Sequence, residues 1–181
     1  MIKIVRLDKK DINSLVELVL LADPSSAQSA DLSEWSYRFR QGIKAWGIKS
    51  KGKLIATESL SYYNIPGEMM NIPDFRVAVL DNGFVHPDYR GRGYHKVLIL
   101  VRTIHALWEG DYKIHSMTKT GNIASIKNLE KMQFNNVDTQ EIDYCKTYLF
   151  EFNSRFLINL FKIINKFRVF LLDIAFAGQG S

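Results

Sequence analysis

The sequence predicts one α/β domain of the mixed, α+β type, and two observations carry this prediction. The chain has 181 residues, of which 46% are hydrophobic, so it can bury a core and is not a disordered chain. Segments with an apolar residue at every second position are interspersed with segments of helical period, in the order β-α-α-β-β-β-α-β-α-β-β. We find neither an internal repeat nor a low-complexity segment.

The first half of the chain carries clear start and stop signals. Asp8 and Asp11 form a capping pattern in front of a helix that must end before Pro24. A turn at residues 50–52 separates two strands. The elements expected in this half are a strand at 2–7, a helix from residue 12, a short helix at 34–41, and strands at 45–48, 54–62 and 77–85.

The second half alternates helices with strands. Val97, Val101, Ile104 and Trp108 recur at helical spacing and indicate an amphipathic helix that ends at Gly110. The elements expected after it are a strand at 112–118, a helix at 122–132, and strands at 137–142 and 146–152.

We expect residues 1–152 to form the domain and residues 153–181 to form a C-terminal amphipathic helical appendage. Its polar residues fall on one helical stripe: Arg155, Asn159, Lys162, Lys166 and Asp173. A membrane-spanning helix needs ~20 mostly apolar residues, so these charges argue against a spanning segment. Two interpretations stay open. The helix packs on its own domain or on a second subunit as a homodimer, or it lies on an anionic membrane surface.

Charge and cysteine content narrow the function classes. The 24 Lys and Arg residues exceed the 19 Asp and Glu residues, and the net charge of +5 is a mild bias toward anionic ligands, too small to indicate nucleic-acid binding. The single cysteine, Cys145, excludes an internal disulfide and is typical of a reduced compartment. The first residues lack the apolar core of a signal peptide, so we expect a cytoplasmic protein. Contact with a membrane surface through the C-terminal helix is compatible with this location.

The most informative stretch runs from Asn82 to His95. A strand ends there, Pro87 stops it, and Gly91 and Gly93 allow a tight turn before a helix starts. Backbone N–H groups in such a turn converge at the positive end of the helix dipole and can hold a pyrophosphate. The stretch lacks the Gly-Lys-Ser/Thr of a nucleotide triphosphatase and the third glycine of a dinucleotide-binding fingerprint.

These residues resemble the GNAT superfamily of N-acyltransferases. The sequence Arg90-Gly-Arg-Gly-Tyr-His95 is similar to the family signature Gln/Arg-x-x-Gly-x-Gly/Ala, which follows a strand that ends in Val-x-Pro. A second block, residues 122–134, is similar to the family pattern Asn-x-x-Ser/Ala-x-x-Leu-Tyr-x-Lys-x-Gly-Phe. The two blocks lie one helix and one strand apart, as in the family, and the resemblance in element order covers residues 2–152.

The resemblance implies a mixed, mostly antiparallel sheet that is splayed between its fourth and fifth strands, with helices on both faces. It implies that acetyl-CoA, as co-substrate, binds in the splay. The residues implied to bind it are the strand residues Gly83, Phe84 and Val85, the loop residues Arg90, Gly91, Arg92, Gly93, Tyr94 and His95, and Asn122 at the pantetheine arm. The reaction implied is direct attack of an amine on the thioester.

Three positions depart from the family pattern. His95 replaces the last Gly/Ala of the signature, so its side chain must point away from the phosphates or bond one of them. Gln133 replaces a glycine, where a left-handed backbone is more costly for a residue with a Cβ. Leu129 replaces the tyrosine that usually protonates the departing thiolate, and leucine has no proton to donate.

The catalytic base is predicted to be Asp81, on the fourth strand, or His115, on the fifth. An amine with a pKa near ~10.4 arrives as ammonium and must first lose a proton, which a carboxylate or histidine can accept. The alternative for Asp81 is that residues 81–83 form a bulge. Glu58 is a third, weaker candidate and reads as a solvated side chain.

Nothing in the sequence selects a general acid or an acceptor. The tyrosines that could serve as acid are Tyr94, Tyr144 and Tyr148. The histidines lack partners at metal-ligand spacing, so we expect no metal site, and Cys145 has no recognisable histidine partner for an acyl-enzyme route. The acceptor is expected to be a small-molecule or peptide amine. The competing interpretation is a catalytically silent acyl-CoA-binding module.

Overall fold

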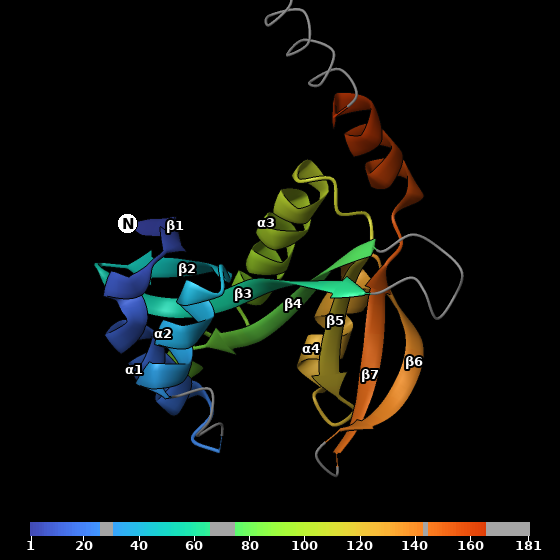
Figure 1. Ribbon diagram of the computed structural model, residues 1–181. Helices are drawn as coiled ribbons and strands as arrows, with labels where there is room; N and C mark the ends of the chain where they lie inside the picture. Colours follow the sequence, from blue (N-terminus) through green and yellow to red (C-terminus); the bar gives the residue numbers. More distant parts are fainter. Residues whose placement is uncertain (26–30, 66–74, 143–144, 166–181) are drawn as a thin grey trace, which may run out of the picture.

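The computed structural model describes residues 1–25, 31–65, 75–142 and 145–165, and it confirms the predicted α+β fold (Figure 1). The seven strands form one sheet in the order β1-β2-β3-β4-β5-β7-β6, and only the β4–β5 pair is parallel. The strands are β1 (Ile2–Leu7), β2 (Lys44–Ser50), β3 (Lys53–Ile65), β4 (Phe75–Val85), β5 (Ile114–Lys119), β6 (Phe134–Ile142) and β7 (Cys145–Phe152). The helices are η1 (Lys9–Asp11), α1 (Ile12–Ala22), α2 (Leu32–Arg40), η4 (Pro87–Tyr89), α3 (Tyr94–Trp108), α4 (Ile123–Lys131) and a segment at residues 155–165.

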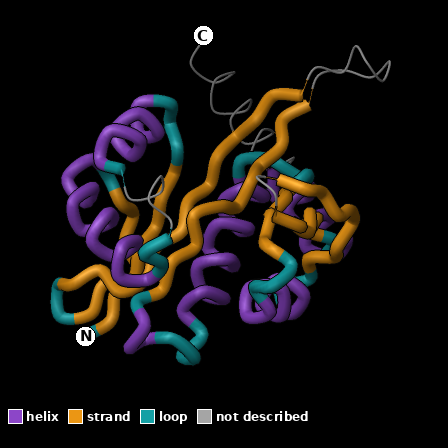
Figure 2. Tube along the Cα trace, turned by 90° about the horizontal axis from the view of Figure 1, so that it is seen from below, coloured by secondary structure: helices purple, strands orange, loops and turns teal. Residues whose placement is uncertain are grey.

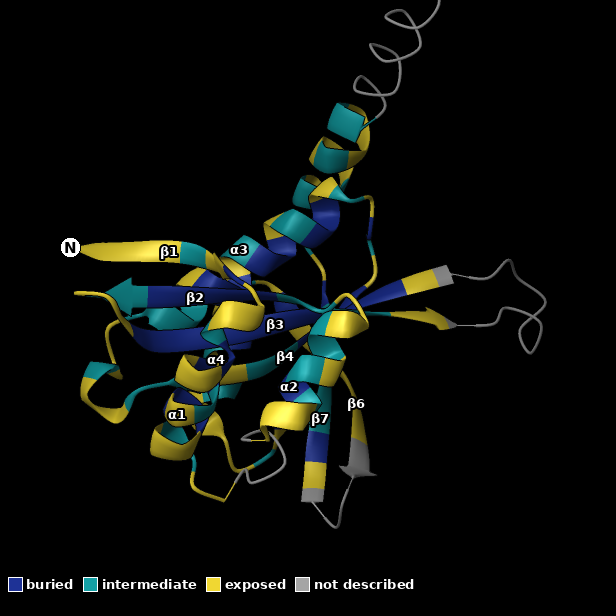
Figure 3. Ribbon diagram, turned by 60° about the vertical axis from the view of Figure 1, so that its left-hand side comes forward, coloured by how far each residue is buried: buried dark blue, intermediate teal, exposed yellow. Residues whose placement is uncertain are grey.

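Helices cover both faces of the sheet, as the resemblance implies. Neighbouring residues of β2 show this directly, because Ala45 belongs to a core cluster under α1 and α2, and Trp46 to a second cluster under α3 and α4. Side chains alternate across a strand, so the two clusters lie on opposite faces. The central strand β3 is buried along most of its length (Figure 3). The sheet therefore has two cores.

Caps and turns explain why the helices begin where they do. Asp8 and Asp11 form the expected capping box, with Asp8 accepting from Lys10 N at 2.8 Å and Asp11 accepting from Asp8 N at 3.1 Å. Asp31 accepts from the N–H groups of Ser33 and Glu34. Because an aspartate at this position satisfies otherwise unpaired amides, α2 starts two residues earlier than its apolar pattern suggests.

The hairpin of β3 and β4 is longer than the sequence predicts, and it contains a bulge. The two strands run side by side toward the connection at residues 66–74 (Figure 2). Thr57 pairs with Phe84, but Ser59 pairs with Asp81, so two residues of β4 lie opposite Glu58. Asn82, inside this bulge, has a φ of +52°. The bulge predicted at residues 81–83 is therefore present.

The splay between β4 and β5 starts directly after three residue pairs. Ala78 pairs with Ile114 and Leu80 with Ser116, and no pair follows. Ser116 Oγ donates to the carbonyl of Leu80 at 3.1 Å, at the point where the strands part. Figure 1 shows the carboxyl ends of β4 and β5 diverging beyond this point. The β5-facing edge of β4 after Leu80 is thus left without a strand partner.

The face of α3 that packs on the sheet is not the one that its spaced apolar residues indicate. Val97, Ile104 and Trp108 are 38–46% exposed, whereas Leu98 and Ile99 are fully buried. Residues 97–101 are all apolar, so the sequence does not fix which stripe of the helix turns inward. The helix itself is confirmed, but the choice of stripe is wrong.

Residues 155–165 are helical and contact the domain. Leu157, Ile158 and Phe161 pack against the α3/α4 cluster, and the ring centroid of Phe161 lies 6.5 Å from that of Trp108. Asn165 Nδ2 donates to the carbonyl of Leu107 at 3.3 Å. The predicted stripe residues Lys166 and Asp173 lie outside the described residues. Among the helices that are described, none is long and apolar enough to cross a membrane.

Candidate functional site

The loop between β4 and α3 presents backbone amides to one spot. Gly91 and Gly93 have φ values of +75° and +81°, a region that favours glycine. Gly93 is the N-cap of α3 and offers no side chain to its first turn. The N–H groups of Tyr94, His95 and Lys96 have no acceptor within the helix. This helix end therefore combines free donors with the positive end of the dipole, which suits a phosphate group.

The arginine side chains of the loop bind backbone carbonyls. Arg90 donates to the carbonyl of Ala22 at 2.6 Å and to that of Val85 at 3.3 Å, so it ties the loop to the end of α1. Arg92 donates to the carbonyl of Asp88 at 3.1 Å. Both side chains hold the loop in shape. The backbone amides of the loop and the remaining guanidinium N–H groups are the donors that a ligand can use.

The edge of β4 beside the splay is a close-packed strip. Gly83 lies in the bulge, where an added Cβ would stand 3.2 Å from both Glu58 Oε1 and His95 Nε2. A side chain at this position would therefore require Glu58 and His95 to shift by a few tenths of an ångström. His86 N donates to Ile55 O at 2.9 Å, so the opposite edge of β4 stays paired with β3. Phe84 and Val85 are partly buried; no residue of β5 pairs with them, and the Val85 carbonyl accepts from Arg90.

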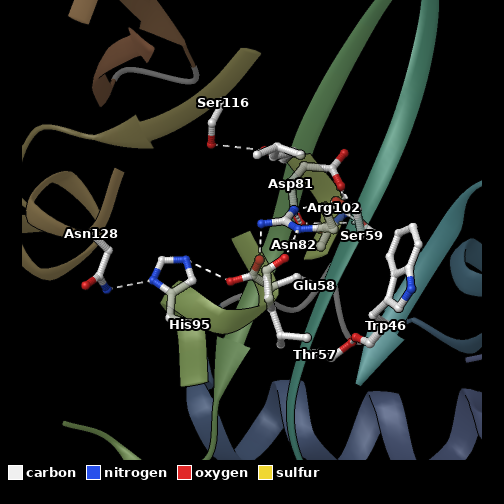
Figure 4. A network of polar contacts seen from close by, with 12 residues as sticks. Trp46, Thr57, Glu58, Ser59, Asp81, Asn82, His95, Arg102, Ser116 and Asn128 are labelled. Carbon is white, nitrogen blue, oxygen red and sulfur yellow. Dashed lines mark hydrogen bonds and ion pairs between the residues drawn. The ribbon is translucent and has the colours of Figure 1, made fainter. Parts of the chain in front are cut away.

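A buried polar network lies on the α3/α4 face, behind the bulge (Figure 4). Glu58 is 0% exposed and forms an ion pair with Arg102, which is 2% exposed. Arg102 also donates to the carbonyls of Ser59 at 2.5 Å and Asp81 at 3.2 Å, which fixes the two strands at the bulge. Burial lowers the pKa of Arg102, and the neighbouring Glu58 opposes this.

His95 extends this network across to α4. Its Nε2 lies 2.9 Å from Glu58 Oε1, and its Nδ1 lies 3.0 Å from Nδ2 of Asn128 (Figure 4). The side chain that replaces the small residue of the family signature therefore points toward the sheet, away from the loop amides. The two halves of the fold are linked at this point by a hydrogen bond between α3 and α4.

The two predicted bases lie on the opposite face, one on each side of the splay. Val79 pairs with His115, and side chains alternate along β4, so Asp81 projects from the same face as His115. The Asp81 carboxylate accepts from the hydroxyls of Ser59 and Ser61 and from the Asn82 amide. His115 Nε2 lies 3.1 Å from a carboxylate oxygen of Glu151.

Solved structures that are similar to this one are N-acetyltransferases. The ribosomal-protein-alanine N-acetyltransferase of Brucella melitensis gives a TM-score of 0.66 over 82% of this chain and 98% of its own, with 16% identity. An acetyltransferase of the GNAT family from Streptococcus pneumoniae gives 0.67 over 83% and 98%, with 15% identity. Arabidopsis thaliana NAA60, solved with a bisubstrate analogue, gives 0.66 over 83% and 97%, with 16% identity.

The chain has the GNAT fold. At these identities the likeness concerns the fold, and it agrees with the splayed sheet and the loop geometry described above. No protein-family model and no curated protein sequence matches the chain.

The second sequence block occupies its expected place in the GNAT fold. Asn122 is the N-cap of α4, and its side-chain oxygen accepts from Ser125 N at 3.1 Å. The side chain predicted to meet the pantetheine arm thus forms a hydrogen bond within its own helix. Leu129, at the position of the family tyrosine, is 1% exposed and packs in the core. Gln133 has a φ of +67°, the left-handed conformation that the missing glycine would adopt freely.

Sequence reasoning undervalued one residue of the site and missed two. Glu58 was expected to be solvated but is fully buried. A signal was present, because apolar residues lie on both sides of it in the strand, at 54–56 and at 60. Arg102 and Asn128 have no distinctive pattern in the sequence, and only the packing of α3 against β3 and α4 brings them into the network of Glu58 and His95.

Among the tyrosines considered as the general acid, Tyr144 lies outside the described residues, while Tyr94 and Tyr148 are partly buried. No cluster of metal-ligating side chains occurs among the residues described.

Proposed function

We propose that the chain is an acetyl-CoA-dependent N-acetyltransferase that moves an acetyl group to a primary amine by direct attack through a tetrahedral intermediate. The observation that carries this proposal is the free β4 edge, from Asp81 to Val85, which leads directly to the uncapped N-terminus of α3. Acetyl-CoA has a linear amide-containing arm joined to a pyrophosphate. An open strand edge followed by a helix N-terminus matches both parts.

The chain's own residues account for binding. The backbone of Gly83 to Val85 hydrogen-bonds the arm as an added strand would, because these groups have no β5 partner. The amides from Gly91 to His95 hold the pyrophosphate, with the glycines keeping Cβ atoms away from it. Arg90 contributes indirectly by fixing the loop against α1. A backbone N–H near Phe84 and Val85 stabilises the oxyanion of the intermediate.

His115 is the general base that the geometry favours. Glu151 occupies its Nε2, and no described residue hydrogen-bonds Nδ1, so that nitrogen can accept the ammonium proton directly or through water. Asp81 is the less suitable base, since three hydrogen-bond donors already occupy its carboxylate. Both lie on the α1/α2 face, so the amine approaches from that side while the network of His95 lies on the other.

A second function is favoured by one specific observation. Leu129 is buried and cannot protonate a thiolate, which fits a catalytically silent acyl-CoA-binding module. The experiment that separates the two is steady-state release of coenzyme A thiol with a panel of amines, which should contain alkylamines, amino sugars and peptides with free N-termini. Turnover with at least one amine supports the enzyme. Binding of acetyl-CoA without turnover on any amine favours the silent module.

A further inference from the structure

A buried carboxylate on the α3/α4 face points an incompletely paired oxygen at His95. Glu58 is 0% exposed, and its Oε2 is held by Arg102. Its Oε1 receives no hydrogen bond of favourable geometry from any described residue, and His95 Nε2 lies 2.9 Å from it. Burying a carboxylate oxygen without a donor is costly. A protonated or correctly turned imidazole at His95 removes that cost.

The charges of this cluster have a sign that suits a thiolate. Glu58 and Arg102 neutralise each other, so a protonated His95 leaves the cluster with one net positive charge. Asn128 is neutral, and the Asp81 carboxylate, bonded to serines on the opposite face of the sheet, raises the pKa of Arg102 less than Glu58 does. The negative charge of a thiolate next to the protonated imidazole would neutralise the positive charge of that ring.

The position of His95 places it beside the path of the thioester arm. The ring lies against Gly83, on the β4 edge that the proposed function assigns to the arm, and it reaches from there to Asn128 in α4. Leu129 follows Asn128 and stands where the GNAT pattern has its proton-donating tyrosine. The chain thus lacks a hydroxyl at position 129 and has an imidazole that contacts the preceding residue, Asn128 (Figure 4).

We propose that His95, supported by Glu58, donates the proton to the departing thiolate of coenzyme A. This inference rests on the proposed function. As the tetrahedral intermediate collapses, the C–S bond breaks and its electron pair goes to sulfur. The Nδ1–H of the imidazolium transfers its proton to that sulfur, which gives the thiol and a neutral imidazole that solvent reprotonates. The proton of the amine goes to the base on the opposite face.

Each partner of His95 has a separate part in this step. Glu58 Oε1 lies 2.9 Å from Nε2, and a small turn of the ring lets it accept from Nε2–H and leaves Nδ1 toward α4, as a carboxylate orients a catalytic histidine elsewhere. Asn128 Nδ2 donates to Nδ1 in the structure, and when acetyl-CoA binds, the arm takes the place of this amide, so that Nδ1 can take up a proton from solvent. Arg102 forms an ion pair with Glu58 and holds it in position, so it is a positioning residue.

The direct test measures the ionisation of the coenzyme A thiol bound to the full chain, through the ultraviolet absorbance of the thiolate during a pH titration. In the wild type, an imidazolium beside the sulfur should lower the thiol pKa relative to the His95→Ala and His95→Gln variants by about one unit, a tenfold change. His105→Gln, a histidine at the far end of α3, is the matched control and should leave the thiol pKa unchanged. Turnover should fall about 10²-fold in His95→Ala with little change in KM, and adding Leu129→Tyr should restore part of it.

The outcomes separate this inference from the function on which it rests. If the wild type binds coenzyme A and the thiol titrates identically in both His95 variants, the inference is overturned while the proposed function stands. A loss of stability or affinity without a change in thiol ionisation would make His95 a structural bridge only, and it overturns the inference too. If calorimetry detects no coenzyme A binding by the wild type, both proposals fail.

Discussion

His115 and Asp81 differ in what already occupies their proton-accepting atoms. The carboxylate of Asp81 is hydrogen-bonded by two hydroxyls and an amide, whereas His115 has one ring nitrogen that no described residue contacts. The sequence ranked Asp81 first because of its place on the fourth strand. It could not reveal Ser59 and Ser61, which the hairpin register brings beside it.

The two candidate bases are separated by matched substitutions. His115→Gln should lower kcat for amine acetylation about 10²- to 10³-fold, since it removes the group that accepts the ammonium proton. Asp81→Asn keeps the shape of the side chain and should cost less than about tenfold. The measurement is steady-state release of coenzyme A thiol. The reverse order of effects would assign the base to Asp81.

The left-handed backbone at Gln133 costs conformational free energy that a glycine would not lose. Its φ of +67° is unfavourable for a residue with a Cβ, and its side chain is exposed, so little contact is lost on removal. Gln133→Gly should raise the free energy of unfolding by about 0.5 to 1 kcal/mol, because relief of the left-handed backbone outweighs the added chain entropy. Urea denaturation measures this. A destabilised variant would show that the side chain contributes more than its exposure indicates.

At the scale of elements, helix boundaries were more predictable than helix faces. Asp8 and Asp11 cap the short η1, from which α1 continues, and α1 ends before Pro24, as the sequence predicts. The inward face of α3 depends on how it packs over β3 and β4, and five consecutive apolar residues leave that choice open. The bulge at Asn82 was one of two readings of residues 81–83, and the register of β3 against β4 decides it.

The helical segment at residues 155–165 offers a test of how it is held. Phe161 is partly buried against the α3/α4 cluster and Trp108, so Phe161→Ala should lower the free energy of unfolding by about 2 kcal/mol. Ile163, on the same segment, is 55% exposed, and Ile163→Ala should change it by less than about 0.5 kcal/mol. Denaturant unfolding of the two variants and the wild type measures both changes in the free energy of unfolding. Equal effects of the two variants would contradict the packing described here.

At the scale of the molecule, the two motif blocks predicted the fold well because each fixes a local geometry: a left-handed turn in one and a capped helix in the other. The cluster of Glu58, His95 and Arg102 was not predictable, because its members come from distant parts of the chain and meet only when α3 packs across the bulge. Long-range contacts of this kind leave no periodic signal in a single sequence.

Overall stability should fall as the solution becomes acidic. Partial burial lowers the pKa of His105 below its ordinary 6.5, more than the neighbouring Glu109 raises it. Hydrogen bonds from Lys44 and Tyr62 hold the pKa of Glu109 below its ordinary value, despite partial burial. Both groups bind protons more readily in the unfolded chain, so their contribution is full above pH 6.5 for His105 and is lost as the pH drops.

The measurement is the free energy of unfolding across this pH range in urea. The wild type should lose stability on acidification from neutral pH, and His105→Gln should reduce the part of that loss that begins near pH 6.5. A wild-type stability that rises on acidification would contradict the assigned directions.

Calorimetric titration of the full chain with acetyl-CoA tests the central claim, that the β4 edge and the first turn of α3 bind an acyl-CoA. The wild type should give a saturable isotherm, and Gly93→Ala, which strains the loop at a φ of +81°, should weaken it about tenfold. Gly42→Ala imposes the same strain at a φ of +83° elsewhere and should leave the affinity unchanged. No heat of binding with the wild type, or an equal loss in both variants, would contradict the account.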